Sequence, residues 1–202
     1  MKWKKLYRVT FVAVQGTEAF YELLTKLLEV EWMVVSEGRF TLEEINAMSI
    51  TDFVKHLGGI FEHSSWVAEE AYKQIPFHSL EHLHSTMMQT VLSADRSRME
   101  GLLKAHPDLA TRLQVTALSA SEQQGAGLDR LTTEEFNLLN DLNRKYTDKF
   151  HFPFILAVRG KNKDDIISAI GVRVERSPQE EWVQAFSEVG TITRFRLSDL
   201  II

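Results

Sequence analysis

The chain has 202 residues, of which 44% are hydrophobic and 25% charged, with ten Gly, four Pro and no Cys. These values are close to the averages of globular domains and exclude a collagen-like, disordered or disulfide-rich protein. The 23 basic and 28 acidic side chains give a net charge of −5. We therefore expect no general attraction for nucleic acid or an anionic membrane, since both are negatively charged. Because Cys is absent, catalysis would depend on His, carboxylates, hydroxyl groups, Arg, Lys or backbone groups.

The first part of the chain differs in pattern from the rest. We expect residues 1–38 to form a short N-terminal extension of unknown role, ahead of a single domain over residues 39–202. Alternating β-branched residues predict a strand over residues 7–14, and Leu and Phe at helical spacing predict a helix over residues 17–35. The apolar face of that helix makes a homodimer an expectation, although the helix could equally fold back on its own core.

The N-terminus also bears on the location of the protein. Residues 1–5 are basic, as at the start of a signal peptide. Arg8 and Thr10 interrupt the apolar stretch that follows, which is too short to span a membrane. We therefore expect a cytoplasmic protein.

Helix starts are marked by three capping boxes, in which a hydroxyl side chain binds the amide three residues on and a Glu there binds back. The boxes begin at Thr41, Thr132 and Ser177. Pro178 then occupies the first helical position, where its fixed φ and missing N–H cost least. Side chains at helical spacing define the inward face of this last helix: Trp182, Phe186, Val189 and Thr193.

Helix ends are marked by Gly58, Pro76 and Pro107, through left-handed glycine caps or the loss of a backbone donor. Past residue 40 there is no clear run of strands and no internal repeat. We therefore predict an all-α fold, a single-domain helical bundle. Apolar periodicity places helices over residues 51–57, 66–74, 80–92, 95–105, 133–150 and 163–176.

His78 and His82 have the spacing of two metal ligands on one helix face. His78 precedes Ser79, which is a better N-cap than interior residue, so His78 is expected outside the helix. No third ligand is evident nearby. Solvated His side chains are the favoured interpretation, and a metal-dependent hydrolase is the alternative.

His106 closes a predicted helix and is followed by Pro107, which favours an extended turn. The helix dipole favours a protonated ring at this end, and a His with a pKa of ~6.5 can transfer protons near neutrality. His106 is therefore a candidate acid–base residue. A simple helix cap is the alternative, and this feature alone favours it.

Two further segments are suited to contact a ligand. Residues 119–128 combine polar side chains with Gly125 and Gly127, which allow close approach of the backbone, although a solvent loop would have the same composition. Residues 150–160 are apolar and contain Pro153 and three Phe, so we expect them inside the protein. If they are not helical, their buried N–H groups need partners, and a polar ligand is one candidate. Core packing is the alternative for their side chains.

Taken in order, these segments resemble the OHCU decarboxylase family, whose members act on 2-oxo-4-hydroxy-4-carboxy-5-ureidoimidazoline (OHCU). The resemblance extends from about residue 40 to the end, and the first 38 residues have no counterpart in it. Five motifs carry it: His-Pro-Asp-Leu at 106–109, Ser-x-x-Glu-Gln-x-x-Ala-Gly-Leu at 119–128, Phe-Pro-Phe-Ile at 152–155, Ile-Phe-Glu-His-Ser-Ser-Trp at 60–66, and Phe-Arg-Leu-Ser-Asp-Leu at 195–200.

This resemblance implies an all-α carboxy-lyase that forms (S)-allantoin and CO2 without a cofactor or metal, as the last step from urate. It implies that His106 is the catalytic acid or base and that Arg196 holds an oxygen-rich end. Because a carboxylate accepts two hydrogen bonds, we expect Glu122 to orient N–H donors of the substrate. By motif position the substrate contacts are Pro107, Ser119, Ala120, Ser121, Glu122 and Gln123, with Phe154, Ile155, Leu156, Ala157 and Val158 mainly through backbone groups.

A functional or covalent link to urate oxidase is a further expectation, because some bacterial relatives carry this domain ahead of a urate oxidase domain. The competing interpretation is a non-catalytic all-α interaction module, in which His106 caps a helix and residues 152–158 are core. A pocket in which His106 and Glu122 converge would favour the enzyme.

Overall fold

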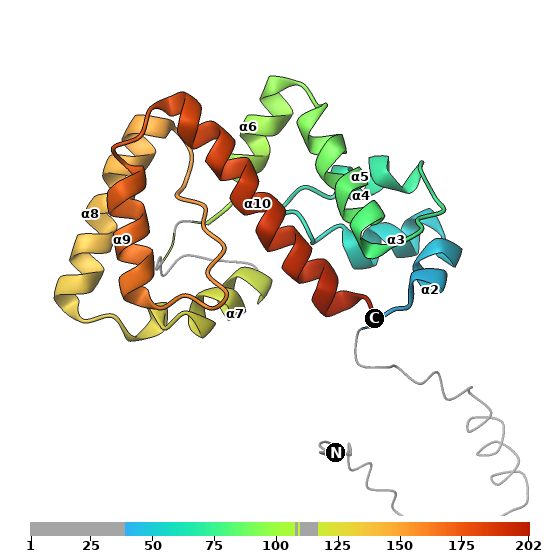
Figure 1. The fold of residues 1–202 in the computed structure, drawn as a ribbon, viewed down its shortest axis with the longest axis horizontal. Coiled ribbons are helices and arrows are strands. Elements are labelled where there is room, and N and C mark those ends of the chain that lie inside the picture. Colours follow the sequence, from blue (N-terminus) through green and yellow to red (C-terminus); the bar gives the residue numbers. More distant parts are fainter. Residues whose placement is uncertain (1–38, 108, 110–116) are drawn as a thin grey trace, which may run out of the picture. The chain divides into compact units, whose positions relative to one another are not determined.

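The computed structural model describes residues 39–107, 109 and 117–202 (Figure 1). The strand and helix predicted before residue 38 lie outside these residues. The described residues form helices α2 (Leu42–Ala47), α3 (Ile50–Leu57), α4 (Trp66–Tyr72), α5 (Leu80–Leu92), α6 (Arg96–Lys104), α7 (Ala117–Gly125), α8 (Thr133–Phe150), α9 (Lys163–Arg173) and α10 (Pro178–Leu200), with a 3₁₀ turn, η1, at Leu128–Arg130.

The all-α prediction is confirmed for this part of the chain, which contains no strand. Its single β-bridge, a parallel one, joins Phe40 to Ile201. The Phe40 N–H donates to Leu200 O at 2.8 Å, and the Ile202 N–H donates to Phe40 O at 2.9 Å. These bonds tie the start of the described domain to the end of α10. No helix within the described ranges is both long and apolar enough to cross a membrane.

The capping signals place the helices correctly. Thr41, Thr132 and Ser177 each form the predicted capping box, and Pro178 lies in the first turn of α10. Helices α5 and α8 have the predicted bounds, and α4 and α9 end two and three residues before the predicted positions. Local hydrogen bonding therefore accounts for most of the helix boundaries.

The end of α3 differs in its geometry from the prediction. Gly58 has a φ of −62°, so it is a right-handed cap and the left-handed glycine cap was wrong. A Cβ at this position would lie 2.4 Å from Val54 O. Glycine is therefore suited to residue 58 because of this close approach and not because of a positive φ.

Helix α7 is the main difference from the predicted ligand-contacting or solvent loop over residues 119–128. The segment up to residue 125 is helical, and the chain turns only at Gly127, which has a left-handed φ of 76°. Ala, Leu, Glu and Gln are strong helix formers and dominate this stretch, so their propensity outweighs the nearby glycines.

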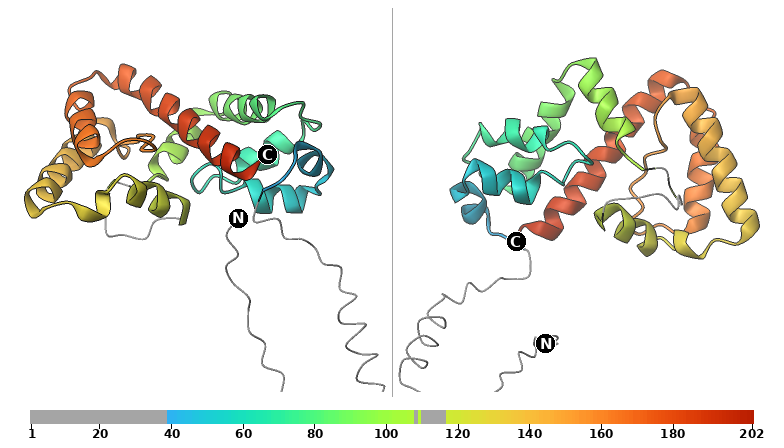
Figure 2. Two further views of the ribbon diagram at one scale, coloured as in Figure 1. Left: turned by 60° about the horizontal axis from the view of Figure 1, so that its bottom comes forward. Right: turned by 180° about the vertical axis from the view of Figure 1, so that it is seen from behind.

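Helix α10 connects two groups of helices in this domain: α3, α4 and α5 form one group, and α8 and α9 form the other. It contacts α5 on one side and α8 on the other, and α8 packs against α9. Figures 1 and 2 show α10 passing between these groups. The inward face predicted for it is confirmed at Phe186, Val189 and Thr193, which are buried, while Trp182 is partly buried against the core.

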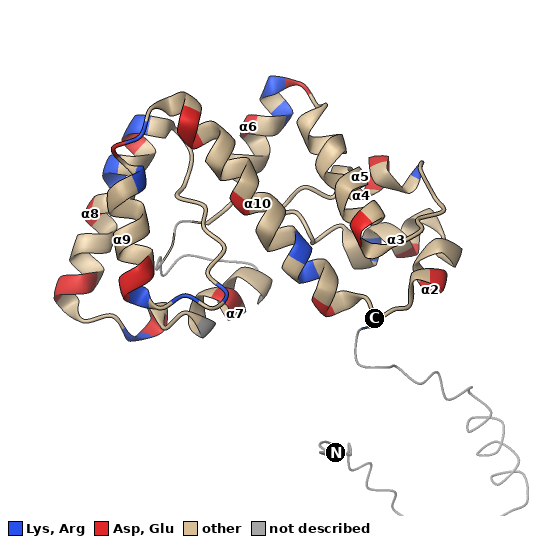
Figure 3. Cartoon of the chain, in the orientation of Figure 1, with Lys and Arg blue, Asp and Glu red and all other residues tan. Residues whose placement is uncertain are grey.

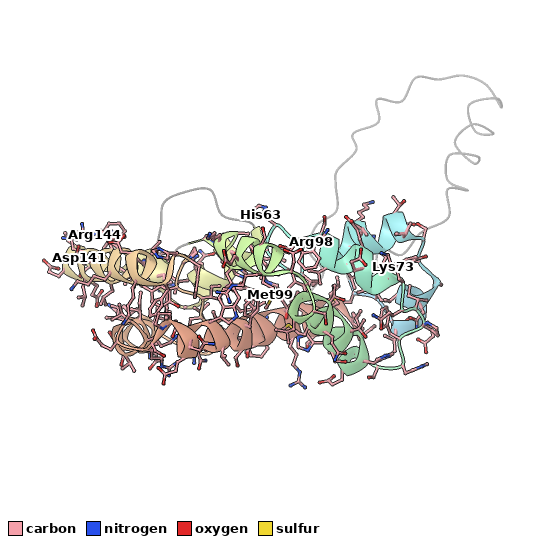
Figure 4. All side chains as sticks on the ribbon, turned by 90° about the horizontal axis from the view of Figure 1, so that it is seen from above. His63, Lys73, Arg98, Met99, Asp141 and Arg144 are labelled. Atoms are coloured by element: carbon pink, nitrogen blue, oxygen red, sulfur yellow. The ribbon has the colours of Figure 1, made fainter. Side chains whose placement is uncertain are left out.

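Charged residues of both signs are interspersed on the helices (Figure 3). Several form exposed pairs within one helix, such as Asp141 and Arg144 on α8, at 2.9 Å (Figure 4). Exposed pairs of this kind contribute little to stability.

Candidate active site

A pocket lies where the C-terminal end of α6, helix α7, the connection between α8 and α9, and helix α10 come together. Its volume is about 30 Å³. The lining residues are His106, Pro107, Leu109, Ser119, Glu122, Gln123, Phe154, Ile155, Leu156, Val158, Ile192 and Arg196. Motifs far apart in the sequence thus converge, and His106 and Glu122 meet in one pocket.

Helix α7 decides which of its polar residues face this pocket. Ser119, Glu122 and Gln123 are three and four positions apart, so they share one face of the helix. Ser119 is buried, whereas Ala120 and Ser121 are exposed and do not line the pocket. Residues 119–123 therefore do not all face the pocket, because helical geometry turns Ala120 and Ser121 to the opposite side.

His106 follows the last turn of α6 and is 8% exposed. Its Nδ1 donates to Leu102 O at 2.9 Å, which leaves Nε2 as the unprotonated nitrogen of the neutral ring. The pKa of His106 is lowered, chiefly by burial, and Arg196 lowers it further. The Leu102 carbonyl and the charges of Glu62 and Glu122 raise the pKa and offset part of this effect. A ring whose protonated form is favoured was expected from the sequence; the pKa is instead lowered, because burial disfavours the charged imidazole.

Arg196 crosses from α10 to the floor of the pocket and is 4% exposed. Its Nε and Nη2 donate to the two carboxylate oxygens of Glu122, each at 2.8 Å. Nη2 also donates to Ser119 Oγ at 3.1 Å. Nη1 donates to Glu62 Oε2 at 3.1 Å and to Ile60 O at 3.2 Å. All five N–H groups thus have protein acceptors, and binding of a substrate oxygen requires the exchange of one of them.

Glu62 is a residue of this cluster to which the sequence analysis assigned no role. It lies between α3 and α4, is 1% exposed, and accepts from Ser119 Oγ at 2.9 Å as well as from Arg196. Its sequence signal is a carboxylate directly after the apolar pair Ile60 and Phe61. A charged side chain is almost never fully buried unless it is paired, so this position predicts a partner elsewhere in the chain.

The segment at residues 154–158 is non-helical and buried, as expected for its apolar sequence. Two protein side chains hold its backbone: Arg173 Nη1 donates to Ile155 O at 2.8 Å, and the Ala157 N–H donates to Glu188 Oε2 at 2.9 Å. Ala157 does not line the pocket. Within the described residues, the N–H groups of Ile155, Leu156 and Val158 have no protein acceptor, and buried N–H groups of this kind are suited to bind a polar ligand.

The alternative metal site is not formed by the described residues. His78 lies before the N-cap Ser79, as predicted, and its backbone N–H donates to His82 Nδ1 at 3.2 Å. The two rings stack in parallel with their centroids 5.2 Å apart. Among the residues that the structure covers, no three His, Asp or Glu side chains come together as metal ligands would.

The chain is similar to several known proteins. The family model described as OHCU decarboxylase matches residues 46–198, more than half of the chain. A "Uric acid degradation bifunctional protein PucL" of Bacillus subtilis is 44% identical over 80% of this chain and 33% of its own length. The 2-oxo-4-hydroxy-4-carboxy-5-ureidoimidazoline decarboxylase of Haloferax volcanii is 40% identical over 79% of this chain and 95% of its own.

The chain spans about a third of the bifunctional proteins from Bacillus that it matches. Two solved structures are also similar. A crystal structure of (S)-allantoin synthase has a TM-score of 0.65 and 32% identity, and covers 80% of this chain and 54% of its own. A crystal structure of OHCU decarboxylase in the presence of (S)-allantoin has a TM-score of 0.59 and covers 70% of this chain and 94% of its own. At 22% identity, the second similarity concerns the fold alone.

Proposed function

Because the chain belongs to the OHCU decarboxylase family, we propose that it converts OHCU to (S)-allantoin and CO2. The observation that carries this proposal is the pocket that unites His106 with Glu122, Ser119 and the backbone of residues 154–158. A non-catalytic module has no need to bury a histidine beside two carboxylates and an arginine.

The substrate's own chemistry supplies the electron sink. Its carboxylate is attached to a ring carbon adjacent to a C=N bond. When the bond to CO2 breaks, its electron pair forms a C=C bond, and the C=N pair moves to the ring nitrogen, which takes up a proton. The hydroxyl proton then leaves as the carbonyl forms, and the neighbouring carbon gains a proton. One proton is consumed for each CO2 released, and this route requires no cofactor.

His106 is the proposed acid–base residue. Its lowered pKa favours the neutral ring, and the Nδ1 bond to Leu102 O leaves Nε2 as the nitrogen that can accept a proton. In this proposal Nε2 accepts the substrate's hydroxyl proton and delivers a proton to one face of the ring carbon, which sets the handedness of allantoin. Well-placed acid–base catalysis contributes about 10²–10⁴-fold.

The other lining groups are proposed to bind the substrate. Glu122, Gln123 and Ser119 would meet its N–H and carbonyl groups, and the N–H groups of residues 155, 156 and 158 would bind a ring oxygen as negative charge develops on it. Arg196 would orient Glu122, and would reach a substrate oxygen only by releasing one of its present acceptors. Pro107 would form part of the apolar wall.

The test is to generate OHCU in situ from urate, with urate oxidase and the hydrolase that follows it, and to record (S)-allantoin by circular dichroism. The protein is expected to accelerate the loss of OHCU, and His106→Asn to lower that rate by about 10²–10⁴-fold with the fold intact. His78→Asn is the matched control, since His78 lies outside the pocket. Chelator should have no effect. Unchanged turnover in His106→Asn would contradict the proposal.

The proposed location is the cytoplasm. The proposed partners are a second copy of the chain and a functional or covalent link to urate oxidase; the bifunctional relatives named for uric acid degradation support the second. Sedimentation of the full chain tests the homodimer.

A further inference from the structure

Glu62 lies behind the pocket lining, between buried neighbours and a closed turn. The residues before it, Ile60 and Phe61, are 4% and 1% exposed and belong to the core. After it, the exposed His63 adopts a left-handed φ of 45°, and the Ser64 N–H donates to Phe61 O at 3.1 Å, which closes the turn. Figure 4 labels His63 on the outer surface of this connection. The backbone thus directs Glu62 inward while its neighbour faces solvent.

The contacts of Glu62 determine how Ser119 meets a ligand. The Ser119 hydroxyl donates its one hydrogen to Glu62 Oε2 at 2.9 Å. Arg196 Nη2 donates to the same hydroxyl oxygen at 3.1 Å. With its hydrogen committed to Glu62, Ser119 faces the pocket as a hydrogen-bond acceptor. A substrate group that meets this oxygen must therefore be a donor, such as a ureido or ring N–H.

Glu62 also sets the charge of the buried cluster. Glu62 and Glu122 both form ion pairs with Arg196. His106 faces this cluster, and the groups that act on it are the Leu102 carbonyl of α6, Glu62, Glu122 of α7 and Arg196 of α10. The negative charge of Glu62 opposes the effect of burial on the pKa of the imidazole.

We propose that Glu62 is a positioning residue of the active site, which acts through Ser119, Arg196 and His106 without touching the substrate. It fixes Ser119 as an acceptor, holds Arg196 against Glu122, and supplies a negative charge that acts on His106. Its catalytic consequence rests on the proposed function, whereas its effect on His106 does not.

The test compares Glu62→Gln with Glu43→Gln, the same chemical change at an exposed position on α2. The His106 ring is followed by NMR during a pH titration, its signal being assigned by its loss in His106→Asn. Glu62→Gln should shift the His106 titration to lower pH and reduce kcat/KM about tenfold or more, because the charge is lost and the hydrogen bonds that Arg196 and Ser119 donate to this side chain weaken. Glu43→Gln should change neither.

Further variants separate charge from orientation. Ser119→Ala should lower kcat/KM without moving the His106 titration, since it removes no charge. If Glu62→Gln does not fold, Glu62→Asp decides: it keeps the charge and should titrate like the wild type, with reduced kcat/KM. A His106 titration unchanged in Glu62→Gln, or shifted in Glu62→Asp, would overturn the proposal. If the wild type itself turns over no OHCU, the proposed function fails, and the titrations still decide the role of Glu62.

Discussion

Replacing Glu181 by Ala is expected to destabilise the protein strongly, because Glu181 neutralises a buried arginine. Its side chain is fully buried, and Arg173 is 5% exposed. Arg173 Nε donates to Glu181 Oε1 at 2.8 Å, and Nη2 donates to the same oxygen. Tyr146 also donates its hydroxyl to Oε1, and burial together with the nearby Glu181 raises the pKa of Tyr146.

The magnitude follows from the groups that lose their partner. In Glu181→Ala the buried guanidinium of Arg173 loses the carboxylate that accepts from its Nε and Nη2 and keeps only the longer pair with Glu188, at 3.7 Å; breaking a buried pair in this way costs about 3–5 kcal/mol. For a protein of this size each kcal/mol lowers Tm by about 2–4 °C, so a decrease of about 6–20 °C is expected. Replacing both partners by apolar residues, as in Arg173→Met with Glu181→Leu, should recover part of that stability, because the buried guanidinium is removed together with its carboxylate. Ile155 O and the Tyr146 hydroxyl still lose their partners in this double variant.

The assay is urea unfolding followed by far-UV circular dichroism, with midpoint and slope compared among the variants. Arg144→Ala is the control, because its pair with Asp141 is exposed, and its unfolding free energy should stay within about 0.5 kcal/mol of the wild type. If Glu181→Ala unfolds within about 1 kcal/mol of the wild type, or the double variant is no more stable than the single one, the reasoning is refuted.

Two further predictions concern the pocket. Ser119→Ala should reduce kcat/KM for OHCU about tenfold, whereas Ser121→Ala should leave it nearly unchanged, since Ser121 lies on the exposed face of α7; equal losses in steady-state kinetics would contradict this helical register. Burial lowers the pKa of both His84 and His106 below 6.5, so at acidic pH the unfolded chain binds more protons than the folded one. The unfolding free energy should therefore fall as pH decreases below about 6.5, and it should fall less steeply in His106→Asn than in the wild type. Urea unfolding at several pH values measures both curves, and an equally steep fall in the two proteins would contradict the prediction.

Most helices follow from local sequence signals. The hydroxyl and Glu of each capping box lie within one turn, so the starts at Thr41, Thr132 and Ser177 depend on no distant contact. The resemblance identified the family and most of the pocket lining. Helix α7 was missed because glycines at its end obscured good helix formers, and the exclusion of Ala120 and Ser121 follows from that helix.

The chemistry of the site depends on what folding buries. By itself, the sequence determined an all-α domain and named His106, Glu122 and Arg196 as candidates. Only the tertiary structure decided that burial lowers the pKa of His106 and that every N–H of Arg196 already has an acceptor. It also joined Glu62 to Ser119 across 57 positions of the chain. Capping and propensity act within a turn, whereas desolvation and ion pairing depend on which distant segments exclude water together.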